Sequence, residues 1–459
     1  MGDSQFQLLR QIPVRRGYDL VVAGGGPGGC GAAIAAARLG VKVLLVECMG
    51  CLGGMGTSGM VAAWSHMANG EHPVIGGLMH ELVEAMYARG FVAPSYDPSF
   101  WNSKYNRGVG YSAEGYKLLL DEMCDQAGVE VRFWTRLIDA EVDGNERRVK
   151  GVVLHNIEGY SFIETPTVID ATGDAILASL CGADCREAGR DTPHIMPPTL
   201  CSAQAGIDYN VFHRDLQQQA VEKALSDGFF SQPDRHVPGL FRSGKTTAIM
   251  NAGHIFGMDA LSSASLSEGM KRGRRLAWEY TRFFRQYVPG CQNIEMVTTA
   301  AAMGVRESRR IVGEYELTHF DYSARRHFPD QIAIYCKQTD IHVYAPTSEE
   351  YARYQREFEQ ADLLEPGESY GIPYGVLVPR GWKNLWVAGR CVSSDLKVNG
   401  AIRDQPACIM MGQAAGTAAV QALRRQETAD ALDTEQLVIT LRNHGANLPQ
   451  HDLSRQMTR

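Results

Sequence analysis

The segment that most constrains the fold of this chain is residues 18–47, which read YDLVVAGGGPGGCGAAIAAARLGVKVLLVE. An apolar run comes first and is followed by three glycines in the spacing G-x-G-x-x-G, namely Gly24, Gly26 and Gly29. Small, helix-forming residues occupy 30–39, and a second apolar run ends at Glu47. This order predicts a strand, a tight turn, a helix and a second strand, the arrangement in which this glycine spacing binds a dinucleotide.

Each part of this segment has a physical role in such a site. Glycines let the backbone turn tightly and approach a pyrophosphate, and the helix N-terminus offers N–H groups and the positive end of the helix dipole. Glu47 has no side-chain donor when ionised, so it can accept from both ribose hydroxyls and would repel a 2′-phosphate. The alternative is an ordinary strand–helix–strand turn without a ligand.

Three later segments favour FAD over NAD as the dinucleotide. Directly after Glu47 the chain reads CMGCLGGMGTSGMVAAW, which includes Leu52-Gly53-Gly54. Residues 166–175, PTVIDATGDA, read as a strand that ends in Ala-Thr-Gly, and residues 385–419 read as a strand, a Gly-Arg turn, a loop and a small-residue helix. Together these segments resemble the bacterial FAD-dependent oxidoreductase family, which has a glutathione-reductase-like FAD-binding fold.

Two further motifs carry the same resemblance, GVRESRR at residues 304–310 and GQAAG at residues 412–416. The resemblance spans about residues 17–424 and implies that a helix beginning near Gln413 directs its N-terminus at the flavin pyrimidine. Covalent attachment of the flavin stays open. The glycine motif and the resemblance together give the expected FAD-binding residues: Gly24, Gly26, Gly29, Glu47, Gly53, Gly54, Ala171, Gly173, Gly389, Arg390, Gln413 and Gly416.

The expected fold is α/β, with a Rossmann-type FAD-binding domain that carries a β-meander insertion, plus an α+β substrate domain. An amphipathic helix with a Gly128 stop and a following strand is predicted over residues 113–137, and turn signals near Gly144 and Gly159 predict the meander. The expected division of the chain is a discontinuous FAD-binding domain at 17–65, 113–190 and 371–424, helices and loops near the flavin at 66–112, a substrate domain at 191–370, and a peripheral C-terminal segment at 425–459.

Four residues are the candidates for catalysis: His342, Arg403, Arg306 and His66. A histidine titrates near neutral pH and suits proton transfer, whereas an arginine can hold a carboxylate or carbonyl oxygen. If residues 304–318 form a helix, Arg306, Arg309 and Arg310 share a face of it. The alternative for the histidines is a core position, and for the arginines a solvated helix face or ion pairs that only hold the fold together.

The predicted function is that of an FAD-dependent oxidoreductase, a dehydrogenase or reductase that transfers hydride between flavin N5 and a small organic substrate, anionic or carbonyl in character. A flavin monooxygenase is the first alternative, but Ala171-Thr172-Gly173-Asp174 lacks the Asp-Gly that those enzymes usually carry at this point. A non-catalytic binding protein that kept the FAD fold is the second alternative.

Composition supplies the remaining expectations. The net charge of -7 argues against nonspecific nucleic-acid binding, and no apolar run is long enough to span a membrane. The first residues lack a secretory leader, and the 11 cysteines read as reduced thiols of a cytoplasmic protein. Because Cys181 and Cys185 have no second pair at metal-ligand spacing, we expect no metal site. The electron donor or acceptor and any homo-oligomeric state stay open.

Overall fold

A parallel five-stranded sheet forms the centre of the larger body of the protein. The computed structural model describes residues 8–93, 95–105, 108–359 and 362–449. The strand order is β19-β10-β2-β3-β6. In chain order these strands are β2 (Leu20–Ala23), β3 (Val43–Val46), β6 (Glu130–Arg132), β10 (Thr167–Asp170) and β19 (Leu385–Val387). Their neighbours pair in parallel, and all but β6 are completely buried, which agrees with the continuous apolar sequences of β2, β3 and β19. The predicted Rossmann-type α/β fold is confirmed.

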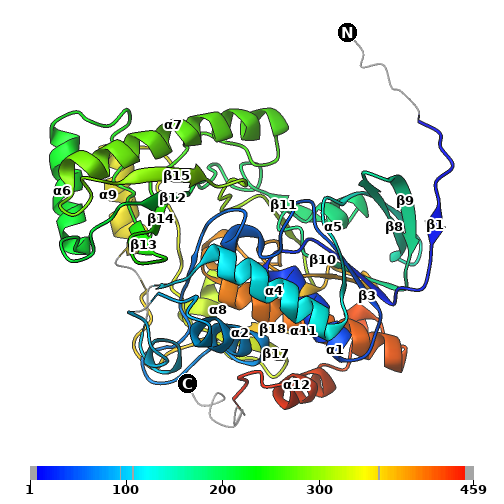
Figure 1. Cartoon of the computed structure of the whole chain (residues 1–459). Helices are drawn as coiled ribbons and strands as arrows, with labels where there is room; N and C mark the ends of the chain where they lie inside the picture. Colours follow the sequence, from blue (N-terminus) through cyan, green and yellow to red (C-terminus); the bar gives the residue numbers. More distant parts are fainter. Residues whose placement is uncertain (1–7, 94, 106–107, 360–361, 450–459) are drawn as a thin grey trace.

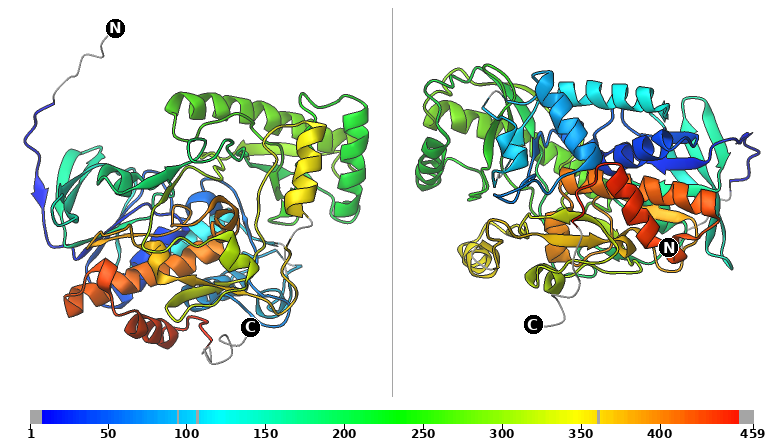
Figure 2. Two further views of the ribbon diagram at one scale, coloured as in Figure 1. Left: turned by 180° about the vertical axis from the view of Figure 1, so that it is seen from behind. Right: turned by 90° about the horizontal axis from the view of Figure 1, so that it is seen from below.

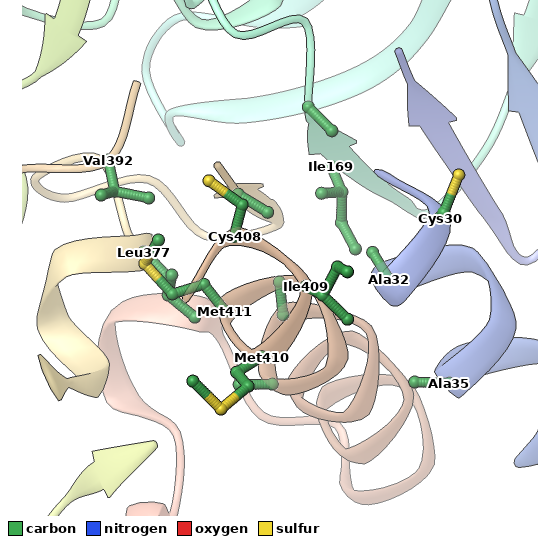
Figure 3. Close-up of a cluster of buried hydrophobic side chains, with 14 of the residues drawn as sticks. Cys30, Ala32, Ala35, Ile169, Leu377, Val392, Cys408, Ile409, Met410 and Met411 are labelled. Carbon is green, nitrogen blue, oxygen red and sulfur yellow. The ribbon is translucent and has the colours of Figure 1, made fainter. Parts of the chain in front are cut away.

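Two helices of small residues pack against each other beside this sheet, α1 (Pro27–Arg38) and α11 (Gln405–Arg425). Added Cβ atoms at Gly412 and Gly416 would overlap the carbonyl oxygens of Gly28 and Ala32, so the helix backbones touch. Figure 3 shows side chains of both helices packed with Ile169 of β10. The expectation that the helix begins near Gln413 is wrong, because α11 begins at Gln405 and the GQAAG segment lies in its middle.

The predicted helix, stop and meander are confirmed. Helix α4 (Ala113–Ala127) is capped by the Ser112 side chain and ends at Gly128, whose φ of 79° is the left-handed conformation that favours glycine. Three antiparallel strands follow β6: β7 (Arg136–Asp143), β8 (Arg148–Asn156) and β9 (Gly159–Glu164). Strand β1 (Val14–Arg15) adds to β9 in parallel and completes a four-stranded sheet at one end of the molecule (Figure 1).

A smaller body lies at the opposite end, drawn mostly in green in Figure 1. Its antiparallel sheet has the order β13-β14-β12-β15. The sheet and its helices are β12 (Ser202–Ala205), α6 (Arg214–Ser226), β13 (Gly239–Arg242), β14 (Ala248–Asn251), α7 (Ser263–Tyr287) and β15 (Glu295–Thr299). Helix α9 (Ser348–Tyr354), in yellow, stands beside this body in both Figure 1 and the left view of Figure 2.

The remaining elements surround the central sheet. They are β4 (Ala63–Trp64), α2 (Gly77–Ala88), α3 (Ser99–Asn102), β5 (Val109–Gly110), α5 (Ile176–Leu180), β11 (Cys185–Glu187), β16 (Arg309–Ile311), α8 (His319–Ser323), β17 (Gln331–Tyr335), β18 (Tyr370–Pro373), α10 (Leu396–Ile402) and α12 (Thr434–Asn443). Short 3-10 turns occur at Gly54–Gly56, Tyr374–Leu377 and Ala429–Ala431, and a π-helical turn occurs at Gln355–Glu359. No described helix is long and apolar enough to cross a membrane.

The structure differs from the sequence expectations at three places. Residues 304–308 form no helix, and Arg309 and Arg310 lie in β16, which pairs with β11, so the shared helix face is wrong. The second hydrophobic core extends only over residues 200–303, whereas β17 and β18 pack into the first core. We therefore propose that the substrate domain is narrower than 191–370. Leu437 and Leu441 of α12 are buried in the first core, so we propose that residues 434–443 belong to the larger body.

Candidate active site

The glycine motif forms a cradle at the start of α1. An added Cβ at Gly24 would overlap the carbonyl oxygen of Ala171, and one at Gly29 would overlap that of Gly24. At Gly26, by contrast, an added Cβ meets nothing within 4 Å, and no side chain caps the helix that starts there. Two of the glycines therefore permit close backbone packing, and the third leaves open space at a helix N-terminus, as a pyrophosphate requires.

Glu47 ties the end of β3 to this cradle. Its buried carboxylate accepts the N–H of Gly25 (2.6 Å) and of Met49 (2.7 Å), and the thiol of Cys48 lies 3.3 Å from it. An ionised carboxylate offers roughly four acceptor positions, so at least one remains for a ribose hydroxyl. The charge and position of Glu47 thus fit the ADP half of a dinucleotide without a 2′-phosphate.

The loop with Gly53 and Gly54 lies directly on the cradle. The Gly53 N–H donates to the Gly25 carbonyl (2.8 Å), and a Cβ on Gly54 would come 2.9 Å from the Gly26 Cα. Both residues have positive φ, 95° and 49°, in the region that favours glycine. They lie beside the open space at Gly26, and their contact with the cofactor stays a prediction.

Arg390 joins three segments that are distant in sequence. Its guanidinium donates to the carbonyls of Gly173 (2.9 Å) and Val305 (2.7 Å) and pairs with Asp174. Next to it, Gly389 has a φ of 98° and open space where a Cβ would be. The structure therefore brings Gly173, Gly389 and Arg390 together at the carboxyl ends of β10 and β19, the edge of a parallel sheet at which such folds bind ligands.

Gln413 and Gly416 lie elsewhere, in the middle of α11. The Gln413 side chain accepts the N–H of Leu78 (2.9 Å) and donates to the carbonyl of His444 (3.3 Å), and Gly416 packs on α1. These contacts are all to protein atoms, and the expected contact of Gln413 and Gly416 with the flavin stays a prediction. The N-terminus of α11 is at Gln405, whose amide donates to the Val61 carbonyl (2.6 Å) beside the glycine-rich loop.

A buried polar cluster, which we call the Arg306 cluster, lies between the two bodies of the protein. The Arg306 Nε donates to His342 Nε2 (2.9 Å), and its two terminal nitrogens contact the Pro197 carbonyl (2.5 Å) and His236 Nε2 (3.2 Å). His342 Nδ1 is 2.9 Å from His254 Nε2, and His254 Nδ1 is 3.1 Å from an oxygen of Asp234. The cluster members are Asp234, His236, His254, Arg306 and His342, and Asp234 and His254 are almost completely buried.

A second set of charges connects this cluster to the N-terminus of α11. Asp340 lies 3.2 Å from Arg403, 3.2 Å from Lys337 and 3.5 Å from His342 Nε2. Lys337 also pairs with Asp404 (2.7 Å), the N-cap residue of α11. The Asp340 side chain is 35% exposed, whereas those of Lys337, His342 and Arg403 are about a tenth exposed. The Arg403 Nε is buried without a hydrogen-bond partner among the described residues.

Burial and neighbouring charges determine the protonation of these groups. Burial, together with the charge of Arg403, lowers the pKa of Arg306 to about 10. Burial and the Arg306 charge hold the pKa of His342 well below its ordinary value. Burial opposes the ionisation of Asp340, but the charges of Lys337 and Arg403 still hold its pKa well below the usual range. Near neutral pH, Arg306 is therefore charged, His342 neutral and Asp340 ionised.

The structure brings together three of the four catalytic candidates, Arg306, His342 and Arg403. His66 is buried with its ring centroid 4.8 Å from that of Tyr105, and the neighbouring Ser65 hydroxyl lies 3.3 Å from Asp404. The other two arginines of the GVRESRR motif form ion pairs, Arg309 with Glu187 (2.8 Å) and Arg310 with Asp191 (2.8 Å).

Sequence reasoning missed Asp234, His236, Lys337 and Asp340. A signal was present, because Asp234 and His236 have the same Asp-x-His spacing as Asp340 and His342. In each pair the carboxylate and the imidazole lie in the same buried region. A repeated Asp-x-His spacing in two segments outside the cofactor motifs is a pattern that could have selected these residues.

Three histidines of the Arg306 cluster are close enough to hold a metal ion, since His236, His254 and His342 each offer a nitrogen within 4.8 Å of the others. However, the Arg306 guanidinium contacts ring nitrogens of both His236 and His342. A permanent cation at the point where a metal would bind opposes a second cation, and we assign no metal to this cluster.

Comparison with known proteins agrees with the cofactor that the cradle fits. Residues 19–441 match the family described as FAD dependent oxidoreductase. A stretch of 45 residues is 58% identical to dihydrolipoyl dehydrogenase of Trypanosoma brucei brucei, and it covers 10% of this chain and 9% of that protein.

Solved structures that match this chain do so at low sequence identity and with TM-scores below 0.5. A geranylgeranyl bacteriochlorophyll reductase-like protein from Thermoplasma acidophilum superposes with a TM-score of 0.47 and 14% identity, over 94% of this chain and 83% of that chain. The flavin-dependent brominase Bmp2 has a TM-score of 0.47 and 12% identity, again over 94% and 83%.

Proposed function

The chain belongs to the FAD-dependent oxidoreductase family, and from this premise we propose that it is a dehydrogenase or reductase of a small anionic or carbonyl substrate. FAD is the cofactor, and when bound it supplies a hydride acceptor or donor at N5. The observation that carries the proposal is the Arg306 cluster, with Asp340 and Arg403, at the N-terminus of α11. These contacts join arginine and histidine side chains to the Asp340 carboxylate, and Arg403 directly precedes Asp404, the N-cap residue of α11.

Arg403 is the better of the two arginines for contact with substrate. Its Nε is buried and has no partner in the described chain, although one terminal nitrogen pairs with Asp340. All three nitrogens of Arg306 already contact protein atoms. We therefore propose that Arg403 holds a substrate oxygen, and that Arg306 is a positioning residue that orients His342.

His342 is the proposed proton carrier. It is neutral near pH 7, and its Nε2 lies within reach of both Arg306 (2.9 Å) and Asp340 (3.5 Å). A proton taken up at Nε2 would exchange the Arg306 contact for one to the Asp340 carboxylate. Proton transfer by a positioned histidine typically contributes about 10²–10⁴ in rate.

An anaerobic screen tests the proposal. Purified yellow protein is mixed with small acids, alcohols, amines and enoates while loss of flavin absorbance is followed, and reduced protein is tested with the unsaturated or carbonyl partners. We expect one compound class to bleach or reoxidise the flavin, and His342→Gln to slow that reaction by at least about tenfold.

Other results of the same screen would favour the alternatives. NADPH-driven oxygen uptake with a hydroxylated product would support a monooxygenase. Bleaching by dithionite, but by no substrate of any class, would support a protein that binds FAD without catalysis.

A further inference from the structure

We propose that His342, His254 and Asp234 form a proton relay with a fixed direction, which connects the buried reaction centre to the protein surface at Tyr351. The inference rests on the proposed function only for the origin of the proton. The geometry of the relay is that of the Arg306 cluster. Two members of the relay, Asp234 and His254, are not among the residues that the sequence suggested for catalysis.

The direction follows from the groups at the two ends of the relay. Arginine can only donate, so the Arg306 Nε makes His342 Nε2 an acceptor (2.9 Å). A neutral imidazole has one donor and one acceptor nitrogen, and the His342 proton is therefore on Nδ1 and points to His254 Nε2 (2.9 Å). By the same rule His254 carries its proton on Nδ1 and donates it to Asp234 (3.1 Å).

The charges around the relay support this assignment. Burial lowers the pKa of His342 and of His254, so both rings are neutral near pH 7. Arg306, Asp340, His254 and His236 face His342. Burial opposes ionisation of Asp234, but its hydrogen bond from His254 helps to hold its pKa below the usual value.

The outer end of the relay lies at α9. The Tyr351 hydroxyl donates to the same Asp234 oxygen that receives the His254 proton (2.8 Å), and it accepts the N–H of the exposed Arg235 (2.8 Å). Asp234 and His254 are buried, whereas Tyr351 is partly accessible. The hydrogen bonds thus run without a gap from Arg306 to a residue in contact with solvent.

One proton enters and one leaves in each passage. A proton from a substrate O–H or N–H binds to His342 Nε2 as Arg306 withdraws, and the new N–H turns to Asp340. The His342 Nδ1 proton moves to His254 Nε2, and the His254 Nδ1 proton moves to Asp234. Both rings remain neutral in the opposite tautomer, and Asp234 passes the proton to the Tyr351 oxygen while the Tyr351 hydroxyl proton moves to solvent. Substrate reduction runs the same transfers in reverse, starting from the opposite tautomers that a forward passage leaves, and returns both rings to the Nδ1–H form. No electrons move through the relay.

The tautomers can be measured without a substrate. The FAD-loaded protein is labelled with ¹⁵N-histidine, and long-range ¹H–¹⁵N spectra at pH 7.5 are assigned with His254→Gln and His342→Gln variants. We expect both rings as neutral Nδ1–H tautomers. An Nε2–H tautomer or an imidazolium at either position would overturn the relay, as would one bound metal ion per chain that is lost in His254→Gln.

Kinetics with the substrate from the screen test proton transfer itself. We expect His254→Gly to slow substrate-driven flavin reduction by at least about tenfold and added imidazole to restore part of that rate. Tyr351→Phe should change the pH profile and the solvent isotope effect. Tyr280→Phe is the matched control, since its hydroxyl contacts only the backbone carbonyl of Asp234 (3.4 Å).

The outcomes separate the relay from the proposed function. Wild-type rates for His254→Gly without imidazole, or equal effects of the two tyrosine variants, would overturn the relay even if the function is correct. If no substrate reduces the flavin, the function fails, and the histidine spectra still decide whether the directed hydrogen bonds exist.

Discussion

Two glycines of the same motif, Gly26 and Gly29, should respond to substitution in opposite ways. At Gly26 the φ is -71°, which any residue adopts, and an added Cβ meets nothing within 4 Å. Gly26→Val should therefore cost the apoprotein only about 0.5–1 kcal/mol, the scale of a weakened N-cap. Because the new side chain occupies the space for the pyrophosphate, we expect FAD to bind at least about tenfold more weakly, roughly 1.4 kcal/mol.

At Gly29 the open space is absent. A Cβ on Gly29, which lies in α1, would overlap the carbonyl oxygen of Gly24, and this oxygen is a backbone atom that cannot turn away as a side chain can. Gly29→Ala should destabilise the apoprotein by at least about 1–3 kcal/mol, as in other overpacked sites. Its loss of FAD is then a consequence of damaged folding.

Two measurements separate the variants: the melting temperature of the apoprotein and the Kd of FAD from calorimetric titration. Gly26→Val should melt within a few degrees of the wild-type protein and bind FAD more weakly. Gly29→Ala should instead melt at a lower temperature even without FAD. Wild-type FAD affinity in Gly26→Val would refute the position of the cofactor. An unchanged melting temperature in Gly29→Ala would refute the packing argument.

Three further predictions concern helix packing, pH and the ribose site. Gly412→Leu should lower the unfolding free energy, measured in denaturant titrations, by at least about 1–3 kcal/mol. The new Cβ would overlap the Gly28 carbonyl oxygen and push α1 away from α11. Burial lowers the pKa of His254 and His342 below the unfolded value of about 6.5, so below that pH the unfolded chain binds protons that the folded protein does not. The unfolding free energy should then decrease as the pH is lowered, by up to about 1.4 kcal/mol per pH unit for each ring. His254→Gln should make this slope shallower in titrations between pH 5 and 8, roughly the range in which histidine charges. An equal slope in the variant would contradict the assignment. Glu47→Gln should lower FAD occupancy of purified protein about tenfold, measured from flavin absorbance, since the amide loses an acceptor oxygen; full occupancy would show that the carboxylate does not contact the ribose.

Local sequence patterns predicted the parts of the fold that depend on neighbours in the chain. The strand, turn and helix around Gly24–Gly29, the Gly128 stop and the two turns of the meander each arise from residues within a few positions of one another. The GQAAG segment shows the limit of this reasoning. The resemblance implied a helix start there, whereas Gly412 and Gly416 in fact allow close contact with the backbone of α1. Because α1 is distant in the sequence, no local pattern reports this contact.

The candidate site shows the same limit more strongly. His342, Arg306 and Arg403 were selected one by one as residue types suited to chemistry, and their mutual contacts depend on the packing of two bodies. Arg309 and Arg310 looked equivalent to Arg306, yet β16 directs them to ion pairs with Glu187 and Asp191. Periodicity on an assumed helix could not separate these arginines, because the segment is not helical.

The central claim is tested most directly by rapid-mixing measurements of flavin reduction in Arg403→Lys, with Arg310→Lys as the control. Lysine keeps the charge opposite Asp340 but cannot hold a planar oxygen pair in the manner of a guanidinium. We predict that Arg403→Lys keeps its FAD and melting temperature while reduction by the identified small anionic or carbonyl substrate slows at least about tenfold, roughly 1.4 kcal/mol. Arg310→Lys cannot keep both the hydrogen bond from Arg310 Nε to the Ser394 carbonyl and the buried pair with Asp191, so it should melt earlier and turn over normally. An Arg403→Lys protein that melts earlier and reduces its flavin at the wild-type rate would contradict the account.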